Sequence, residues 1–284
     1  MEKRKSKRKI IKFIILILLV AILAWTIWAN KALELNSFTI TSKELPKSFD
    51  GYRIAQISDL HNTEFGKGNE KLIELLKQAS PDIIAITGDL IDSNHTNMAI
   101  SLEFAKRAME IAPCYYVSGN HEGLIDRSEY EYLKAELEKL GVVVLCDSEA
   151  VIEKDGEKIS ITGIDDPITT LDGIGLHMGP TSIKNLASSE FAVLLSHRPE
   201  YFQQYVQSGV NIVLAGHAHG GQFRLPFIGG LYVPNQGLFP EYDSGLYSQG
   251  NTNMIVSRGL GNSRVPLRFN NRPEVVLVEL KTEN

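Results

Sequence analysis

The sequence predicts an α/β fold, in which parallel strands are joined by helical crossovers. Two observations indicate this class: apolar segments of strand length alternate with segments of helical periodicity, and polar motifs rich in Asp and His follow several of the strands. With 284 residues, of which 43% are hydrophobic, the chain can bury one sizeable core. We therefore expect one soluble domain over residues 38–284, preceded by a single membrane segment.

Strands and helices alternate through the first half of this domain. The expected strands there are 38–41, 53–57, 82–87 and 115–117, and the expected helices are 69–78, 98–111 and 128–140. In the second half, Asp155-Gly156 is a strong turn signal and predicts a hairpin of 151–153 with 158–162. The remaining expected elements are strands 191–195, 212–214, 254–257 and 275–280 and a helix over 199–207.

Residues 10–29 form an apolar segment, interrupted only by Lys12 and Thr26. Twenty helical residues span ~30 Å, the thickness of the hydrocarbon core of a bilayer. Trp25 and Trp28 lie near one end, where indole rings favour the membrane interface. We predict an uncleaved transmembrane anchor over 10–29. The alternative is a cleaved signal peptide, although no small-x-small cleavage site follows the apolar segment cleanly.

The charge distribution predicts how the chain is oriented in the membrane. Residues 1–12 carry seven basic residues and one acidic residue, so the rest of the chain holds 22 basic and 33 acidic residues, a net charge of −11. The positive-inside rule predicts a basic cytoplasmic tail over 1–9, a short tether over 30–37 and an extracytoplasmic catalytic domain of a single-pass membrane protein. An acidic body also argues against nucleic-acid binding.

Seven oxygen and imidazole donors follow five of the predicted strands: Asp59, His61, Asp89, Asn120, His197, His217 and His219. No thiolate is among them, so the set suits Mn, Fe or Zn. The first three motifs are spaced by about one strand-helix-strand unit, which brings them to the carboxyl edge of one sheet, where α/β folds bind ligands. Two divalent metal ions sharing one carboxylate form a centre that splits phosphate esters.

These motifs resemble those of the calcineurin-like metallophosphoesterases. The matching segments are Asp59-Leu60-His61, Gly88-Asp89-Leu90-Ile91-Asp92, Gly119-Asn120-His121-Glu122, Ser196-His197 and Gly216-His217-Ala218-His219. The stretch from Gly220-Gly221-Gln222 through Ser257-Arg258-Gly259-Leu260-Gly261 is similar to a membrane-anchored bacterial branch of that family. The resemblance implies a four-layer α-β-β-α sandwich with two mixed sheets, here preceded by one N-terminal transmembrane helix.

The resemblance also implies how the ligands are shared between two ions, with Asp89 as the bridging carboxylate. One ion would be held by Asp59, His61 and His219, and the other by Asn120, His197 and His217. A bridging carboxylate lets two cations lie ~3.5–4 Å apart. Neutral His and Asn ligands leave the centre with a net positive charge, which attracts a phosphate.

We expect a hydroxide that bridges the ions to attack phosphorus in line with the leaving oxygen. The resemblance assigns His121 to the leaving group, as general acid or charge stabiliser, and assigns Asp92 to hold His121 by its other ring nitrogen. A turn or helix cap is the alternative role for Asp92. Asn62 and Arg198 stand beside ligands and are either phosphate contacts or surface residues.

The sequence also predicts the structure of two further segments. Asp165-Asp166 precedes Pro167 and is expected to form a solvated turn, with help in metal binding as the alternative. Residues 223–240 are apolar but broken by glycines. They form either an apolar lip that faces the bilayer beside the metals or a loop packed under the sandwich.

The sequence therefore predicts a membrane-anchored, metal-dependent phosphoesterase that hydrolyses phosphodiester or pyrophosphate bonds. Its phosphoester substrate is expected to be lipid-linked or part of the cell envelope. A phosphomonoesterase of the same family is one alternative, and a non-catalytic membrane-anchored binding protein is an alternative of another class. A protein Ser/Thr phosphatase is disfavoured, since Asp92-Ser93-Asn94 lacks the Arg that follows Asp in that branch of the family.

Overall fold

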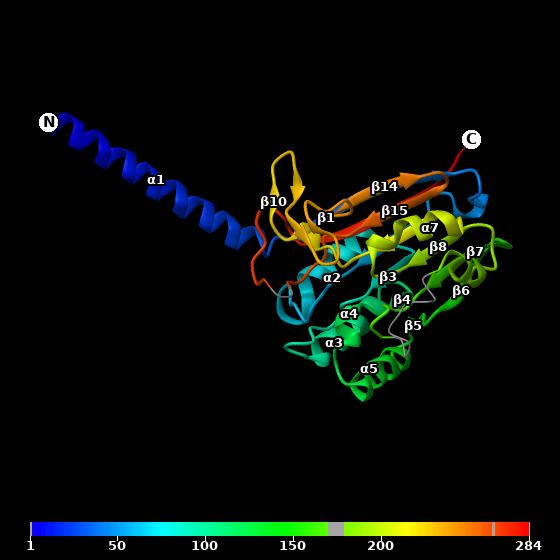
Figure 1. Cartoon of the computed structure of the whole chain (residues 1–284). Coiled ribbons are helices and arrows are strands. Elements are labelled where there is room, and N and C mark those ends of the chain that lie inside the picture. The colour runs from blue at the N-terminus through cyan, green and yellow to red at the C-terminus, as the bar shows by residue number, and fades with distance from the viewer. Residues whose placement is uncertain (1, 170–178, 263–264, 284) are drawn as a thin grey trace.

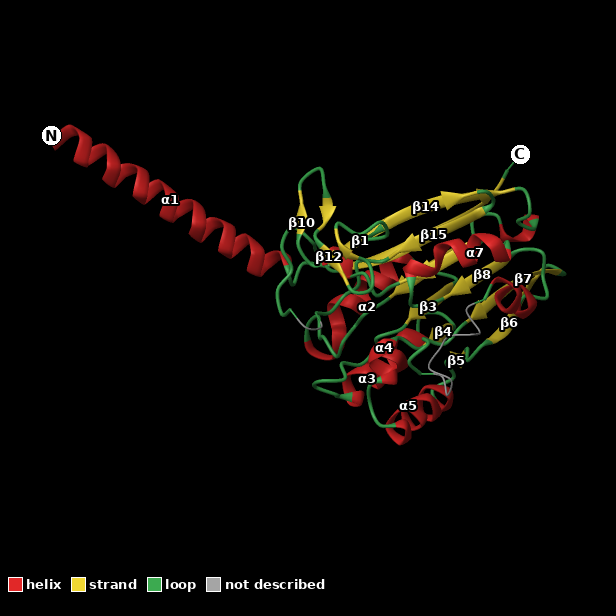
Figure 2. Cartoon of the chain, viewed as in Figure 1, coloured by secondary structure: helices red, strands yellow, loops and turns green. Residues whose placement is uncertain are grey.

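In the computed structural model, the described residues 2–169, 179–262 and 265–283 form two six-stranded sheets (Figures 1 and 2). In spatial order the first sheet contains β1 (Glu34–Ser42), β16 (Glu274–Thr282), β2 (Arg53–Ile57), β3 (Ile83–Thr87), β4 (Cys114–Val117) and β5 (Val143–Val144). The second contains β14 (Gly245–Gln249), β15 (Thr252–Val256), β9 (Ile212–Ala215), β8 (Ala192–Leu195), β7 (Glu157–Gly163) and β6 (Ser148–Lys154). Each sheet combines parallel and antiparallel pairs, which confirms the predicted α/β class with two mixed sheets.

Helices cover the outer faces of both sheets. The first sheet packs against α2 (Glu70–Ala79), α3 (Met98–Met109) and α5 (Arg127–Lys139), and the second against α6 (Pro180–Leu186) and α7 (Phe202–Ser208). A third apolar cluster lies between the sheets and includes Ile54 and Ile161. Successive side chains of a strand point to opposite faces of its sheet. Ile54 therefore faces the other sheet, whereas Ala55 faces the helices. The layers follow the order α-β-β-α.

The strands that carry the polar motifs agree with the sequence prediction. β2 has the predicted bounds, and β3 and β9 differ from theirs by a single residue. The predicted hairpin is also present: Asp155 and Gly156 join β6 to β7 with φ angles of 51° and 80°, as a type I′ turn requires. Helix α6 and the short strands between residues 224 and 238 were not predicted, since segments of two to seven residues carry too little periodicity.

The N-terminal segment is one continuous helix, α1 (Glu2–Ala29), which extends away from the two sheets (Figure 1). Among the described residues, Lys7–Ala29 is the one helical stretch long and apolar enough to cross a membrane. Within the segment 30–37, predicted as a short tether, β1 begins at Glu34 and pairs with β16 over its whole length. The Asn30 side chain also bonds to both the N–H and the carbonyl of Arg268, each at 2.8 Å.

We expect Ile161→Ala to lower the free energy of unfolding by about 2–5 kcal/mol, since it opens a cavity between the sheets. The matched control is Val151→Ala on the edge strand β6, where the side chain is 45% exposed and the change should stay within about 0.5 kcal/mol. Urea unfolding of the full chain in detergent measures both. Equal losses in the two variants would contradict the assignment of Ile161 to the central core.

Candidate metal centre

The five motif loops leave the carboxyl ends of strands that meet at one margin of the sandwich. β2, β3 and β4 run parallel in the first sheet, as do β8 and β9 in the second. Two buried hydrogen bonds join the sheets there: His197 Nδ1 donates to the Thr87 carbonyl at 2.8 Å, and Gln56 Nε2 donates to the Ala215 carbonyl at 2.8 Å. The motifs of both sheets therefore converge on one place.

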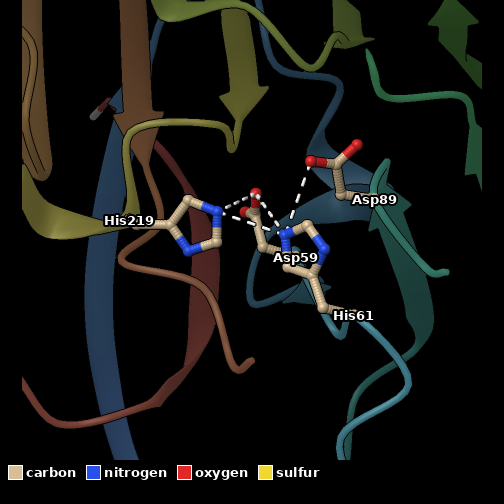
Figure 3. A group of neighbouring side chains, drawn as sticks. All are labelled: Asp59, His61, Asp89 and His219. Atoms are coloured by element: carbon tan, nitrogen blue, oxygen red, sulfur yellow. Dashed lines mark hydrogen bonds and ion pairs between the residues drawn. The ribbon is translucent and has the colours of Figure 1, made fainter. Parts of the chain in front are cut away.

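The first group of donors consists of Asp59, His61, Asp89 and His219, whose ligand atoms lie within 4.8 Å of one another. Figure 3 shows the four side chains gathered around a common point, with His219 Nε2 3.3 Å from Asp59 Oδ1 and His61 Nε2 3.5 Å from Asp89 Oδ2. All four are buried. This is the set expected around one ion, together with the expected bridging carboxylate.

The second group consists of Asp89, His197 and His217, again within 4.8 Å. Asp89 belongs to both groups, and its Oδ2 lies 3.3 Å from His197 Nε2. Because His197 Nδ1 donates its proton to a carbonyl, its Nε2 lone pair is available to a metal. Among the described residues, Asn120 Oδ1 and His197 Nε2 are buried without a hydrogen-bond partner. An orphaned amide oxygen in the loop that approaches Asp89 fits a divalent cation.

The pKa values of the imidazoles differ across the centre, and those of His61 and His217 favour a cation. Burial lowers the pKa of His61 to about 4, and burial with the Arg198 guanidinium lowers the pKa of His217 well below its usual range. Neutral imidazole is the form that binds metals. Burial opposes the charge of His197, but Asp89 and Asp59 outweigh it and raise the pKa of His197 to about 10. In the metal-free protein the negative charges of Asp89 and Asp59 therefore favour a positive charge at His197.

The backbone at the centre is strained. Five of the seven predicted ligands have φ angles between 47° and 65°, in the left-handed region: Asp59, His61, Asp89, His217 and His219. This conformation costs an L-residue roughly 1–2 kcal/mol, although Asp, Asn and His tolerate it better than most. Strain of this kind gathers at functional sites, where the surrounding structure holds it in place.

Glu122 holds two ligand loops together, a role that the sequence analysis did not assign. Its buried carboxylate accepts four backbone N–H groups: Oε2 from Gly119 at 2.8 Å and Asp89 at 3.0 Å, and Oε1 from Leu90 at 2.8 Å and Ile91 at 3.3 Å. The loops after β3 and β4 approach so closely that a Cβ on Gly119 would overlap the Asp89 carboxylate. The sequence signal that could have indicated this role is an acidic residue three positions after a helix N-cap.

His121 is buried and forms a third donor group with His61 and Asp92, and its ring lies edge-on to that of His61 at a centroid distance of 4.5 Å. The predicted hydrogen bond from the His121 ring to the Asp92 carboxylate is not formed, since Asp92 Oδ1 lies 4.0 Å from His121 Nδ1. That oxygen instead accepts the Asn94 N–H at 2.7 Å, which is the alternative turn-cap role. His121 Nδ1 accepts the Ser93 N–H at 3.0 Å. The neutral ring must therefore carry its proton on Nε2.

The two candidate phosphate contacts have protein partners. Arg198 makes a two-pronged ion pair with Asp166, including Nη2 to Oδ1 at 3.0 Å, and its Nη1 lies 3.1 Å from His217 Nε2. Asp166 is 1% exposed, so the prediction of a solvated turn was wrong for this residue. Asn62 donates to the His95 carbonyl at 2.8 Å. Arg198 thus supports a ligand, and Asn62 joins two loops.

Arg268 is a further residue that the sequence analysis missed. It is 1% exposed and lies at the centre, with Nη2 3.3 Å from His219 Nδ1 and Nε donating to Asn262 Oδ1 at 2.9 Å. Its backbone holds Asn30 at the end of α1. One residue therefore links the N-terminal helix to a predicted metal ligand.

Comparison with known proteins agrees with this geometry. The calcineurin-like phosphoesterase family matches residues 52–221. YkuE of Bacillus subtilis, named an uncharacterized metallophosphoesterase, is 33% identical over 260 residues, covering 89% of this chain and 87% of YkuE. YaeI of Escherichia coli, named a phosphodiesterase, is 29% identical, and the match covers 81% of this chain and 82% of YaeI. A Danio rerio transmembrane protein with a metallophosphoesterase domain is 26% identical, and the match covers 85% of this chain and 56% of that protein. This chain therefore belongs to the calcineurin-like phosphoesterases and is a phosphoric ester hydrolase.

Proposed function

We propose that this protein hydrolyses phosphodiester or pyrophosphate bonds with two divalent cations, chosen from Mn, Fe and Zn. The observation that carries the proposal is that Asp89 belongs to both donor groups. One cation would be held by Asp59, His61 and His219, the other by Asn120, His197 and His217, and both by Asp89. When bound, the cations would supply an activated water and neutralise charge on the phosphoryl oxygens.

In this proposal His121 serves the leaving group. The Ser93 N–H occupies Nδ1, so the Nε2–H of His121 would donate a hydrogen bond that stabilises charge on the leaving oxygen. Asp92 acts indirectly, because its carboxylate caps the turn that holds the Ser93 N–H against the ring. The Glu122 carboxylate keeps the loops of Asp89 and Asn120 in register.

The preference for a diester has its support in YaeI, the relative named a phosphodiesterase. The proposed location is the cell membrane, with α1 as a single-pass anchor and the catalytic domain outside the cytoplasm. Its support is the length and composition of α1, the basic residues before it and the zebrafish relative named a transmembrane protein. The direct contacts Asn30–Arg268–His219 would hold the centre near the bilayer, where a lipid-linked phosphate is the proposed substrate.

Metal analysis of the purified chain tests the ligand set. We expect about two divalent ions per chain and about one in Asn120→Ala, because the variant loses a ligand of one ion. Its metal-free stability should not fall, since Asn120 Oδ1 accepts no hydrogen bond from the described residues. Asn62→Ala is the control and should keep the full metal content. Unchanged metal content in Asn120→Ala would remove Asn120 from the set.

Aryl phosphate hydrolysis tests the reaction. We expect kcat/KM to be higher for bis-p-nitrophenyl phosphate than for p-nitrophenyl phosphate, with both activities abolished by a chelator and restored by Mn. A preference for the monoester would favour the phosphomonoesterase alternative. Inert protein at full metal content would favour a non-catalytic binding protein.

We expect His121→Ala to lower turnover of a diester with a poor leaving group by ~10²–10⁴-fold while its metal content stays unchanged. The loss should be smaller for a nitrophenyl ester, whose leaving group needs little protonation. His95→Ala, an exposed histidine on the same side of the domain, should retain wild-type rates. Full turnover of the poor ester by His121→Ala would exclude the proposed role.

A further inference from the structure

Two short hairpins follow the last metal-ligand motif and carry exposed apolar side chains. The first pairs β10 (Arg224–Leu225) with β11 (Gly229–Gly230), and the second pairs β12 (Tyr232–Val233) with β13 (Gly237–Leu238). Val233 is buried in the core, so part of the segment packs under the sandwich. At the turn of the first hairpin, however, Phe227 is fully exposed and Ile228 is more than half exposed. Leu238, which ends β13, and Phe239, which follows it, are also more than half exposed. We call these four residues the apolar tips.

The backbone of the apolar tips is unusual. Phe227 and Phe239 have φ angles of 65° and 54°, in the left-handed region. Bulky residues seldom adopt this conformation, and turn positions of this kind ordinarily carry Gly or Asn. Neither side chain is buried in the fold. Packing within the domain thus gives no reason for a Phe at either position, which points to a contact outside the domain.

The base of the first hairpin is attached to the end of the N-terminal helix. Arg224 N–H donates to the Phe269 carbonyl at 3.0 Å, and Phe269 N–H donates to the Gln222 carbonyl at 3.3 Å. The Phe269 ring packs edge-on against Trp25 of α1, at a centroid distance of 6.1 Å. Figure 1 shows the β10 hairpin protruding beside the end of α1, on the side of the domain from which α1 leaves.

We propose that the apolar tips insert into the interface of the lipid bilayer that α1 crosses and give the domain a second membrane contact. Aromatic and branched apolar side chains at the depth of an anchor's Trp residues are suited to that interface. The contact would depend on burial of apolar side chains and not on attraction of basic residues to lipid phosphates. The chain after residue 12 has a net charge of −11, and Arg224 at the hairpin base is paired with Asp243 at 3.1 Å. This inference rests on the membrane anchor of the proposed function.

A second contact fixes the orientation of the domain, which α1 alone leaves free to rotate about its axis. The hairpin begins five residues after His219. Docking of the apolar tips would therefore hold the metal centre at a constant height above the lipid headgroups. Phosphates of membrane lipids lie at that level, so the contact selects for substrates presented at the bilayer surface.

Tryptophan fluorescence of the full chain tests the inference in phosphatidylcholine vesicles with brominated or ordinary acyl chains. The two native tryptophans, Trp25 and Trp28, report on insertion of α1. We expect the fluorescence added by Phe227→Trp to be quenched by the brominated lipid to a similar fraction as theirs. Tyr132→Trp is the control: it is exposed on α5, distant from α1 in Figure 1, and should add unquenched fluorescence.

If the native tryptophans are quenched but the fluorescence added by Phe227→Trp is not, the second contact is excluded and the anchor stands. If that result comes with concentration-dependent association of the chain, the apolar tips bind a second copy instead of lipid. Unquenched native tryptophans would overturn the anchor and the second contact together. None of these outcomes depends on hydrolysis, so a failure here is distinguishable from a failure of the proposed reaction.

Discussion

A single buried carboxylate, Asp89, joins the two halves of the centre. It belongs to the donor group that lies mostly on the first sheet and to the group that lies on the second. A buried carboxylate is costly unless positive charge or hydrogen bonds compensate it. In the metal-free protein Asp89 raises the pKa of His197, and we propose that cations compensate the Asp89 charge in the active enzyme. The position of Asp89 is in turn fixed by Glu122, whose carboxylate accepts backbone N–H groups from two loops.

Rigidity at the centre extends to the N-terminal helix. The ligand turns hold left-handed conformations, and such strain persists only where surrounding contacts hold it. Arg268 supplies part of that support, since it is buried against His219 and its backbone is bonded to Asn30. In the proposed membrane location, a flexible tether would let the domain tumble above the bilayer. The direct attachment and the proposed contact of the apolar tips would together favour one orientation, in which the centre stays close to the membrane surface.

The parts of the structure that local sequence determines were predicted well. Short apolar runs of strand length located β2 and β3, and turn chemistry located the hairpin at Asp155-Gly156, because both signals lie within a few residues. The donors that gather around Asp89 were found from their positions after strands. Contacts between distant segments were missed. The Arg198–Asp166 pair spans 32 residues and the Arg268–His219 contact spans 49, and neither partner carries a local pattern that indicates the other.

The central claim is that two cations share Asp89. Electron paramagnetic resonance of the Mn-loaded chain tests it most directly, because two Mn ions ~3.5–4 Å apart are magnetically coupled. The account predicts a coupled spectrum from the wild-type chain and, in Asp89→Asn, the spectrum of isolated ions or loss of bound Mn. A wild-type spectrum of isolated Mn at full occupancy would contradict it.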